Sequence, residues 1–457
     1  MTTQQRIDSL LETIEKQSIQ IDFLLKKVDK LELEITVCKN KKNSNNSHIP
    51  PSKDENRIKT NQSLRVKSGK KPGGQLGHPG KTLEFSYDIN QIDEFVEHIP
   101  DYCNSCGKNL STNEKKLVDK RQIIDIPPIK PVRTEHQIFS KICTCGCVNK
   151  ERFPENMPSK IQYGPNIEAT IAYLSTRQYL PFQRMQEFFS DVMNLSISQG
   201  GIASILQRFT QKSTPFYLMI KEGLQRSTYA GTDETGIVVN GIKYWGWCWQ
   251  NRRFTYITIT DNRAFKTIED EFKNGFPNTF IGHDRYAAHF KCLAKGHQIC
   301  IAHLLRDLNY IEELHKSEWA KSVKTILYEA LELKNKLLPH QYKNQNIKRQ
   351  NIEYKLDELL KTVIPEQHKK AITLQKQLII HQQKTLLFLH HPEIPPDNNG
   401  SERAIRNIKV KQKISGQFKS TTGADAFAVI RSVIDTTIKS GENIFQALFL
   451  IAWQGTE

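Results

Sequence analysis

The chain has 457 residues, enough for two or three domains with buried cores, which excludes a small scaffold held together by disulfides. Lys and Arg number 65 against 49 Asp and Glu, so the formal net charge is +16. A positive surplus of this size is typical of proteins that bind polyanions, and nucleic acid is the first candidate. No stretch is apolar enough for a membrane span and the polar N-terminus is not a signal sequence, so we expect a cytoplasmic protein with reduced Cys.

Residues 1–38 carry a seven-residue repeat of apolar side chains. One position is β-branched and the position three residues later is mostly Leu, which favours a parallel two-stranded coiled coil. Gln17 would be a polar, register-setting break in this seam. A helix packed on its own domain is the alternative, but five sustained heptads favour a homodimer formed through residues 1–38. The repeat consists of Ile7, Ile14, Ile21, Val28 and Ile35, followed three residues later by Leu10, Gln17, Leu24, Leu31 and Cys38.

Residues 39–82 lose this periodicity and are rich in Lys, Asn, Ser, Gly and Pro. Between Lys39 and Lys81, eleven Lys or Arg stand against two acidic residues, so more than half of the net charge is concentrated here. We expect a flexible basic linker that follows DNA phosphates, with Lys70 and Lys71 as DNA-binding residues. A solvated tail with no ligand is the alternative.

Two cysteine clusters indicate zinc in a β-rich, zinc-ribbon-like domain over residues 83–160. Cys103 and Cys106, followed by Gly, are typical of a zinc knuckle, because the turn lets two thiolates reach one ion. The second cluster offers Cys143 with either Cys145 or Cys147. The long separation of the clusters predicts a β-rich insertion between them. Four thiolates leave no open position for water, so the zinc would be structural, and unmetallated thiols are the alternative.

The sequence pattern of residues 161–225 predicts a helical DNA-binding domain. Helices are expected at 166–177, 182–190 and 198–210. Short helices around a tight turn, with Ser198 as N-cap, fit a helix-turn-helix, although any compact helical domain offers such a pattern.

From residue 226 to 308 the pattern predicts the first part of a catalytic core. Three strands at 229–239, 242–250 and 254–260 form an antiparallel meander, since Asn-Gly joins the first two. A helix at 264–274 then lets a fourth strand, at 278–282, return parallel to the first. This is the ribonuclease-H-like order.

In that order, Asp233 on the first strand lies beside Asp284 at the end of the fourth. Two carboxylates at one sheet edge suit Mg²⁺ or Mn²⁺, which prefer oxygen ligands and keep positions open for phosphate and water. A local cap or ion pair formed by Asp233 or Glu234 is the alternative. Trp245, Trp247 and Trp249 alternate on one strand face and are predicted to be core residues rather than a base-stacking surface.

The third carboxylate is expected after a helical insertion over residues 309–395, in the C-terminal helices at 396–457. Ser401 can begin a helix that carries Glu402 in its first turn. Asp397 competes with Glu402, but we interpret it as a turn residue or a support of the site. His303 and Arg306 could face the metals or the scissile phosphate, although a buried structural His is as plausible. Basic residues recur on the helix as a stripe that can grip phosphates: Arg403, Arg406 and Lys409.

Together these segments closely resemble the transposases of the insertion sequence 66 family, over nearly the whole chain. The matching pieces are the leading heptads, the Gly73–Gly80 box, the Cys clusters, Asp233–Gly236, His283-Asp284, Ala302–Arg306 and Asp397–Arg403. The resemblance implies the large catalytic subunit of a bacterial element, nucleoid-associated, with Asp233, Asp284 and Glu402 as its Asp-Asp-Glu triad. It also implies that residues 309–395 interrupt the catalytic fold, and that accessory proteins of the same element take part.

The implied reaction is two-metal phosphoryl transfer on double-stranded DNA, in which cleavage of the transposon ends precedes joining to target DNA. The fold expected is therefore multidomain α+β. A ribonuclease-H-like, structure-selective DNA nuclease is the alternative among enzymes. A non-catalytic DNA-binding regulator is the alternative of another class.

Overall fold

The computed structural model describes residues 3–39, 83–154, 157, 159–342 and 346–454. The chain divides into two compact units, Ile58–Lys130 and a larger unit of Met1–Arg57 with Pro131–Glu457. The predicted basic linker, including Lys70 and Lys71, lies outside the described residues except for Lys39. Among the described helices, none combines the length and apolar character that a membrane crossing needs.

The heptads form one continuous helix, α1 (Thr3–Lys39), as predicted. Apolar side chains of its repeat, among them Leu10, Ile21 and Leu31, are exposed along the helix of the single chain. The coiled coil stays a prediction.

The smaller unit contains a short 3-10 helix, η1 (Ile89–Gln91), and the first cysteine turn. In the larger unit the second turn joins β1 (Ser140–Ile142) to β2 (Val148–Lys150) in an antiparallel hairpin. Residues 114–139, all described, form neither helix nor strand, so the β-rich insertion predicted between the knuckles is wrong. This stretch contains three prolines between 127 and 131, which cannot donate hydrogen bonds to a strand ladder.

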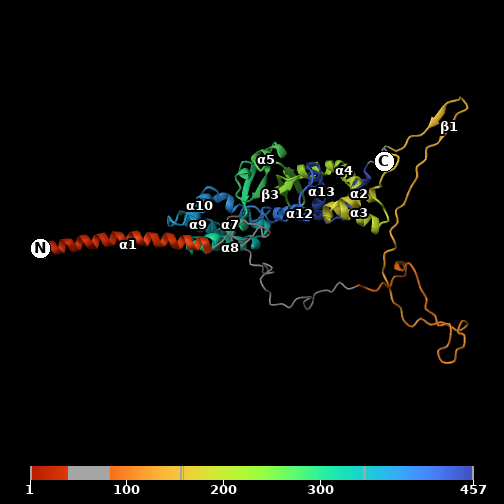
Figure 1. Cartoon of the computed structure of the whole chain (residues 1–457), viewed down its shortest axis with the longest axis horizontal. Coiled ribbons are helices and arrows are strands. Elements are labelled where there is room, and N and C mark those ends of the chain that lie inside the picture. Colours follow the sequence, from red (N-terminus) through yellow and green to blue (C-terminus); the bar gives the residue numbers. More distant parts are fainter. Residues whose placement is uncertain (1–2, 40–82, 155–156, 158, 343–345, 455–457) are drawn as a thin grey trace. The chain divides into compact units, whose positions relative to one another are not determined.

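A five-stranded mixed sheet with the order β5-β4-β3-β6-β7 positions the site (Figure 1). The first three strands are antiparallel, β6 runs parallel to β3, and β7 runs parallel to β6. The predicted order of the first four strands is confirmed, and β7 adds an edge. The strands are β3 (Tyr229–Val239), β4 (Ile242–Gln250), β5 (Thr255–Thr260), β6 (Phe276–His283) and β7 (Ala294–Ile299).

Asn240 and Gly241 both have positive φ, which the tight turn between β3 and β4 requires. The crossover from β5 to β6 contains the predicted helix, α5 (Phe265–Glu271), and a short helix, α6 (Ala287–Phe290), follows β6. Trp247 and Trp249 are buried and stacked, with ring centroids 5.8 Å apart, which confirms them as core residues.

The helices between residues 165 and 225 share one hydrophobic core with the sheet and the C-terminal helices. Ser198 caps α4 as predicted, because its hydroxyl accepts a hydrogen bond from Gly201 N at 3.0 Å. The predicted helix end at 210 is too early, since Ile220 and Leu224 continue the buried face of α4. These helices therefore have no separate core. They are α2 (Pro165–Ala172), the π-helix η2 (Tyr173–Arg177), α3 (Phe182–Asp191) and α4 (Gln199–Gln225).

The C-terminal helices cover the sheet. α12 (Asn399–Ser415) packs against β3 and β4, α13 (Thr421–Ser440) against β5 and α4, and α14 (Ile444–Trp453) against α2. Figure 1 shows α12 beside β3. Ser432 and Thr436 of α13 accept hydrogen bonds from backbone N–H groups of β5. Since β5 is an edge strand, α13 thereby satisfies donors that no neighbouring strand can pair.

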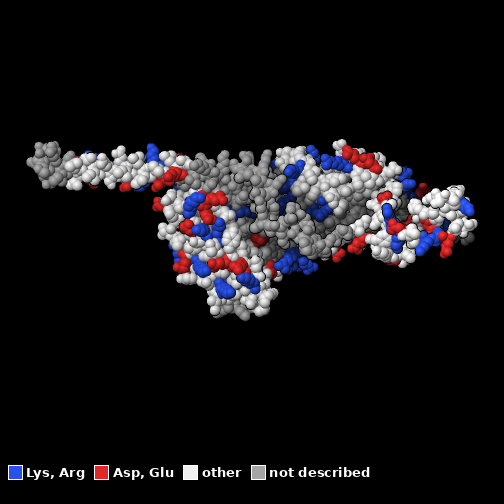
Figure 2. All heavy atoms as spheres, turned by 90° about the horizontal axis from the view of Figure 1, so that it is seen from below, with Lys and Arg blue, Asp and Glu red and all other residues white. Residues whose placement is uncertain are grey.

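The segment between β7 and α12 is helical, as predicted, and builds a second hydrophobic core. Tyr229 and Phe280 of the sheet belong to this core. Figure 2 shows acidic and basic side chains interspersed on its surface, in agreement with ion pairs such as Lys355–Glu329. The elements are α7 (Ile301–His315), α8 (Glu318–Lys336), η3 (Pro339–Tyr342), α9 (Ile347–Lys361), α10 (Lys369–Ile380), α11 (Gln382–Thr385) and η4 (Leu387–Leu389).

Candidate active site

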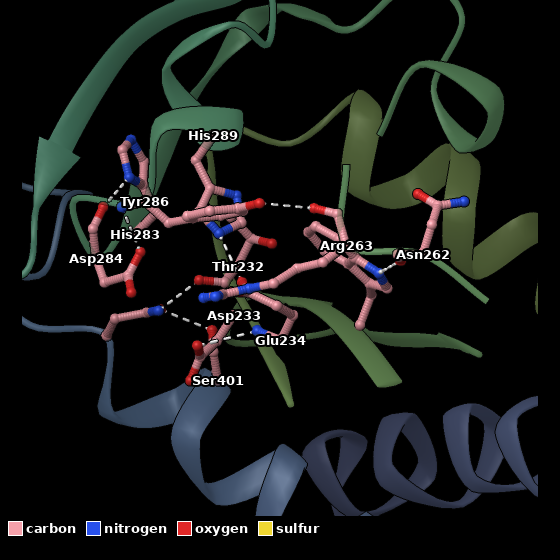
Figure 3. Close-up of polar contacts among 12 residues, drawn as sticks. Thr232, Asp233, Glu234, Asn262, Arg263, His283, Asp284, Tyr286, His289 and Ser401 are labelled. Carbon is pink, nitrogen blue, oxygen red and sulfur yellow. Dashed lines mark hydrogen bonds and ion pairs between the residues drawn. The ribbon is translucent and has the colours of Figure 1, made fainter. Parts of the chain in front are cut away.

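Parallel pairing of β3 with β6, two inner strands of the sheet, brings the first two predicted acids to the same end of this strand pair. The last backbone pair joins Gly231 to Gly282, and Asp233 and Asp284 each follow two residues later. An oxygen of Asp233 accepts a hydrogen bond from Glu234 N at 2.9 Å, and an oxygen of Asp284 accepts one from Tyr286 N at 2.8 Å (Figure 3). Asp233 therefore lies within β3 where its pairing with β6 ends, and Asp284 lies directly after the end of β6.

Glu402 enters from the first turn of α12. Asp233 lies on the same side of β3 as Ile237, which packs in one cluster with Ile405 of α12. Burial raises the pKa of Asp233 well above its usual range, and the negative charges of Glu234, Asp284 and Glu402 raise it further. The other two acids predicted from the sequence are therefore close enough to Asp233 to disfavour its charged form.

Two residues predicted as supports contact Glu402. His303 Nε2 lies 3.6 Å and Arg306 Nη1 lies 3.4 Å from the same oxygen, Oε1. Arg406 of α12 lies 3.6 Å from the other oxygen. The Glu402 side chain is largely buried, so α7 and α12 together fix its orientation.

Asp397 and the three predicted DNA-binding residues of α12 differ in exposure and in their contacts. Asp397 accepts a hydrogen bond from Asn399 N at 3.0 Å, which makes it a turn residue. Arg403 and Arg406 are exposed on α12. Lys409 is half-buried and donates to the carbonyl of Gly236, so it ties α12 to β3.

Asn398, which sequence reasoning missed, docks the start of α12 onto β3. Its buried side chain donates to the carbonyl of Thr232 at 2.6 Å and accepts from Ser401 Oγ at 2.7 Å. The helix begins at Asn399, two residues before the predicted Ser401, because that hydroxyl bonds Asn398 and does not cap the helix. The sequence signal was the Asn-Asn-Gly run that precedes Glu402.

Glu234 lies on the opposite side of β3 from Asp233 and pairs with two residues that are distant in sequence, not with local partners. Arg263 donates to Glu234 Oε1 from Nε at 2.8 Å and from Nη2 at 2.5 Å. His289 Nε2 lies 2.9 Å from Oε2, and both of these side chains are 1% exposed. Burial alone would raise the pKa of Glu234, but His289 and Arg263 outweigh it and hold the pKa below its ordinary value. Sequence reasoning missed Arg263 and His289.

Two histidines of adjacent parallel strands lie near this network. His283 Nε2 is 3.1 Å from Nδ1 of His297. Burial lowers the pKa of His283 well below its usual range and lowers that of His297 to about 4. Both imidazoles are therefore neutral at neutral pH.

Across the described residues, no group of three or more His, Cys, Asp or Glu side chains is arranged to hold a metal ion as it stands. The chemistry of the donors nevertheless fits a hard divalent cation, because Asp233, Asp284 and Glu402 are all carboxylates. The mutual repulsion that raises the pKa of Asp233 is what a bound cation would offset.

The two cysteine turns have the same backbone pattern. In the first, Gly107 N donates to the carbonyl of Cys103, and Cys103 N to that of Lys108, both at 2.9 Å. In the second, Gly146 N donates to Cys143, and Cys143 N to Cys147, both at 2.8 Å. Both glycines have positive φ. The second turn is one residue shorter, so Cys145 takes the place of Cys106 and Cys147 takes that of Lys108.

Both turns suit thiolates. Backbone N–H groups of Ser105 and Cys106 lower the pKa of the Cys103 thiol. The N–H of Cys145 does the same for Cys143. Hydrogen bonds of this kind favour the deprotonated sulfur that binds zinc.

The mixed sheet, the helices that cover it and the acids beside β3 define an α+β protein with an acidic site. Residues 160–426 match the family described as Transposase IS66 family, and residues 100–146 match the zinc-finger binding domain of transposase IS66. The first match spans more than half of the chain, so the protein belongs to the IS66 family of transposases and the resemblance seen in the sequence is confirmed. A comparison with curated proteins finds no significant match.

Proposed function

We propose that this protein is a DNA transposase that binds the terminal inverted repeats of an insertion sequence. It catalyses metal-dependent strand cleavage and then strand transfer into target DNA. One observation carries the proposal. In a chain of the transposase family, Asp233 of β3 is close enough to Asp284, directly after β6, and to Glu402, in the first turn of α12, for both charges to raise its pKa, which supports one site for the three acids.

Asp233, Asp284 and Glu402 would hold Mg²⁺ or Mn²⁺. When bound, such a cation polarises the phosphate and stabilises charge on the attacking and leaving oxygens. His303 and Arg306 orient Glu402 through its Oε1. The exposed guanidinium groups of Arg403 and Arg406 are placed to bind backbone phosphates beside Glu402.

Both chemical steps are displacements at phosphorus, so one set of acids serves both. In the first step a water oxygen attacks the phosphate at the transposon end, and the 3′ oxygen leaves. In the second step that 3′-hydroxyl oxygen attacks a phosphate of the target DNA and displaces its 3′ oxygen.

The zinc ligands of this proposal are Cys103, Cys106, Cys143 and Cys145. The equivalent hydrogen bonds of the two turns support Cys145 over Cys147. The zinc-finger match, which ends at residue 146, also includes Cys145 and leaves out Cys147. Four thiolates make this zinc structural.

The proposed partners are double-stranded DNA, a second copy of the chain bound through residues 1–38, and accessory proteins of the same element. DNA contact is proposed for Lys70 and Lys71 of the linker and for the exposed Arg403 and Arg406 of α12, whereas the predicted contact by Lys409 is replaced by its bond to Gly236. A cytoplasmic, nucleoid-associated location follows from a DNA substrate.

The test is a reaction of the purified protein with a labelled transposon end, in Mg²⁺, in Mn²⁺ and in EDTA. We expect metal-dependent cleavage and joining by the parent and by Glu366→Gln, an exposed control, and neither activity in Glu402→Gln. Cleavage without joining would instead establish the nuclease. End binding without cleavage in either metal, also when the accessory proteins of the same element are added, would establish the non-catalytic regulator.

A further inference from the structure

Arg263 connects the strand that carries Asp233 to the loop that carries Asp284. On one side, its guanidinium donates two hydrogen bonds to Glu234, the residue after Asp233. On the other side, it lies over the ring of Tyr286, 4.0 Å from the centroid. Figure 3 shows Arg263 extending toward Glu234 from the segment that follows β5.

Tyr286 completes the connection to Asp284. Its hydroxyl donates to the carbonyl of Arg263 at 3.0 Å, while its backbone N–H donates to the Asp284 carboxylate at 2.8 Å. The same tyrosine therefore binds Arg263 through its side chain and Asp284 through its backbone. A displacement of Arg263 is transmitted to the Asp284 loop through these two bonds.

His289, three residues further along, holds the second oxygen of Glu234. The His289 ring packs edge-on against Trp247, and Trp245 lies below the Arg263 guanidinium at 4.9 Å. We call Glu234, Arg263, Tyr286 and His289 the Arg263 clamp. It joins three segments that are distant in sequence, from β3, the turn after β5, and the loop and helix after β6.

The cost of burying the Glu234 carboxylate and the His289 ring, each 1% exposed, indicates a role beyond packing. Glu234 lies on the same side of the sheet as the buried side chains of Trp247, Trp249 and Tyr256. An apolar residue at position 234 would fill the same space without desolvating a carboxylate. The buried charge is instead fully bonded by Arg263 and His289. Groups that hydrogen-bond a metal ligand commonly fix the geometry of that ligand, and the backbone N–H of Tyr286 makes such a bond to Asp284.

We propose that Arg263 is a positioning residue that sets the separation of the Asp233 and Asp284 carboxylates, through Glu234 on one side and Tyr286 on the other. The inference rests on the proposed function, in which these two carboxylates hold a divalent cation. It adds to that function the residue that aligns the acids before the cation binds.

The test compares full-length variants in two measurements. Arg263→Lys keeps the charge but loses the paired hydrogen bonds and the planar stacking. Arg253→Lys is the matched control, since Arg253 also lies over a ring, that of Phe254, but is exposed in the turn between β4 and β5. Mn²⁺ affinity is measured by electron paramagnetic resonance. Hydrogen exchange of residues 284–290 is measured without metal, and melting temperature verifies folding.

We expect Arg263→Lys to weaken Mn²⁺ binding by about tenfold to a hundredfold and to accelerate exchange in residues 284–290. Arg253→Lys should match the parent in both. Parent-like affinity and exchange in folded Arg263→Lys would overturn the proposal. If Arg263→Lys does not fold, Tyr286→Phe decides, because it removes only the hydroxyl bond and must weaken binding and speed exchange if the clamp acts.

Asp233→Asn separates this inference from the proposed function. If Mn²⁺ binding survives Asp233→Asn unchanged, the metal site of the proposed function is wrong. The exchange measurement then still decides whether Arg263 holds the Asp284 loop, because it needs neither metal nor DNA.

Discussion

At the scale of single residues, the site depends on the absence of side chains as much as on the acids. Gly231 lies two residues before Asp233, directly below the docked start of α12. A Cβ atom there would come within 2.5 Å of Asn398 Oδ1 and 2.9 Å of Ser401 Oγ. Because Glu402 follows Ser401, the glycine allows the third acid to approach the first.

Gly231→Ala should therefore separate Glu402 from Asp233. We expect cleavage to fall by about a hundredfold, since a displacement of about 1 Å can cost that much, and the melting temperature to drop. Gly236→Ala on the same strand is the control, because the nearest atom to its Cβ would be Lys243 Cε at 3.7 Å. Equal cleavage by the two variants in a labelled-end assay would show that α12 docking does not set the site.

The buried histidines make stability depend on pH. Burial, with a smaller contribution from Lys384, lowers the pKa of His297 to about 4 in the folded state, against about 6.5 when unfolded. Between these values the unfolded chain binds a proton that the folded chain does not, so stability falls as pH falls. One such proton changes the unfolding free energy by about 1.4 kcal/mol per pH unit.

His297→Asn should flatten this dependence between pH 6.5 and about 4, whatever its effect on stability at neutral pH. The measurement is urea unfolding at several pH values. His98→Asn, at an exposed position, is the control and should keep the slope of the parent. An unchanged slope in His297→Asn would mean that the imidazole titrates alike in both states.

At the scale of elements, the sequence pattern predicted those strand limits that depend on local sequence alone. The limits of β3 and β4 follow from alternation and from Asn240-Gly241, whose turn needs no tertiary contact. The end of α4 did not follow, because the sheet and α13 stabilise its second half.

The residues of the candidate site also fall into those that local sequence predicts and those that only the fold brings together. Asp233 could be found because an acid within an apolar strand is conspicuous, and Asp284 and Glu402 because each adjoins a predicted element boundary. Arg263 and His289 could not, since only the fold brings them to Glu234. No spacing along the chain marks residues 234, 263 and 289 as neighbours.

The exposed repeat of α1 leads to a prediction about assembly. If the apolar seam pairs with a second chain, Ile21→Asp puts a charge into that seam and should convert a dimer to a monomer in sedimentation at micromolar concentration. Ile19→Asp is the control, because Ile19 is exposed on the same helix but lies outside the repeat. A dimer that persists in Ile21→Asp would place the dimer interface elsewhere.

At the scale of the whole molecule, positive charge is unevenly distributed. Acids and bases alternate on the helical insertion, where Lys361 pairs with both Asp357 and Glu358. The surplus is concentrated in residues 39–81. Binding to DNA should therefore depend on salt mainly through that segment, since each phosphate contact releases counterions.

Lys70→Gln with Lys71→Gln should reduce the slope of log affinity against log salt concentration by about 1.8, because each phosphate contact contributes about 0.9. The matched control is Lys369→Gln with Lys370→Gln, an exposed adjacent pair at the start of α10 with the same change in charge. Fluorescence anisotropy with a labelled duplex from 50 mM to 200 mM salt measures both slopes. If the two double variants lose the same amount, the net charge of the molecule governs binding and the linker has no special part in it. If only the Lys70 and Lys71 variant changes, the linker follows the phosphates, and specificity for the transposon end must come from the folded units.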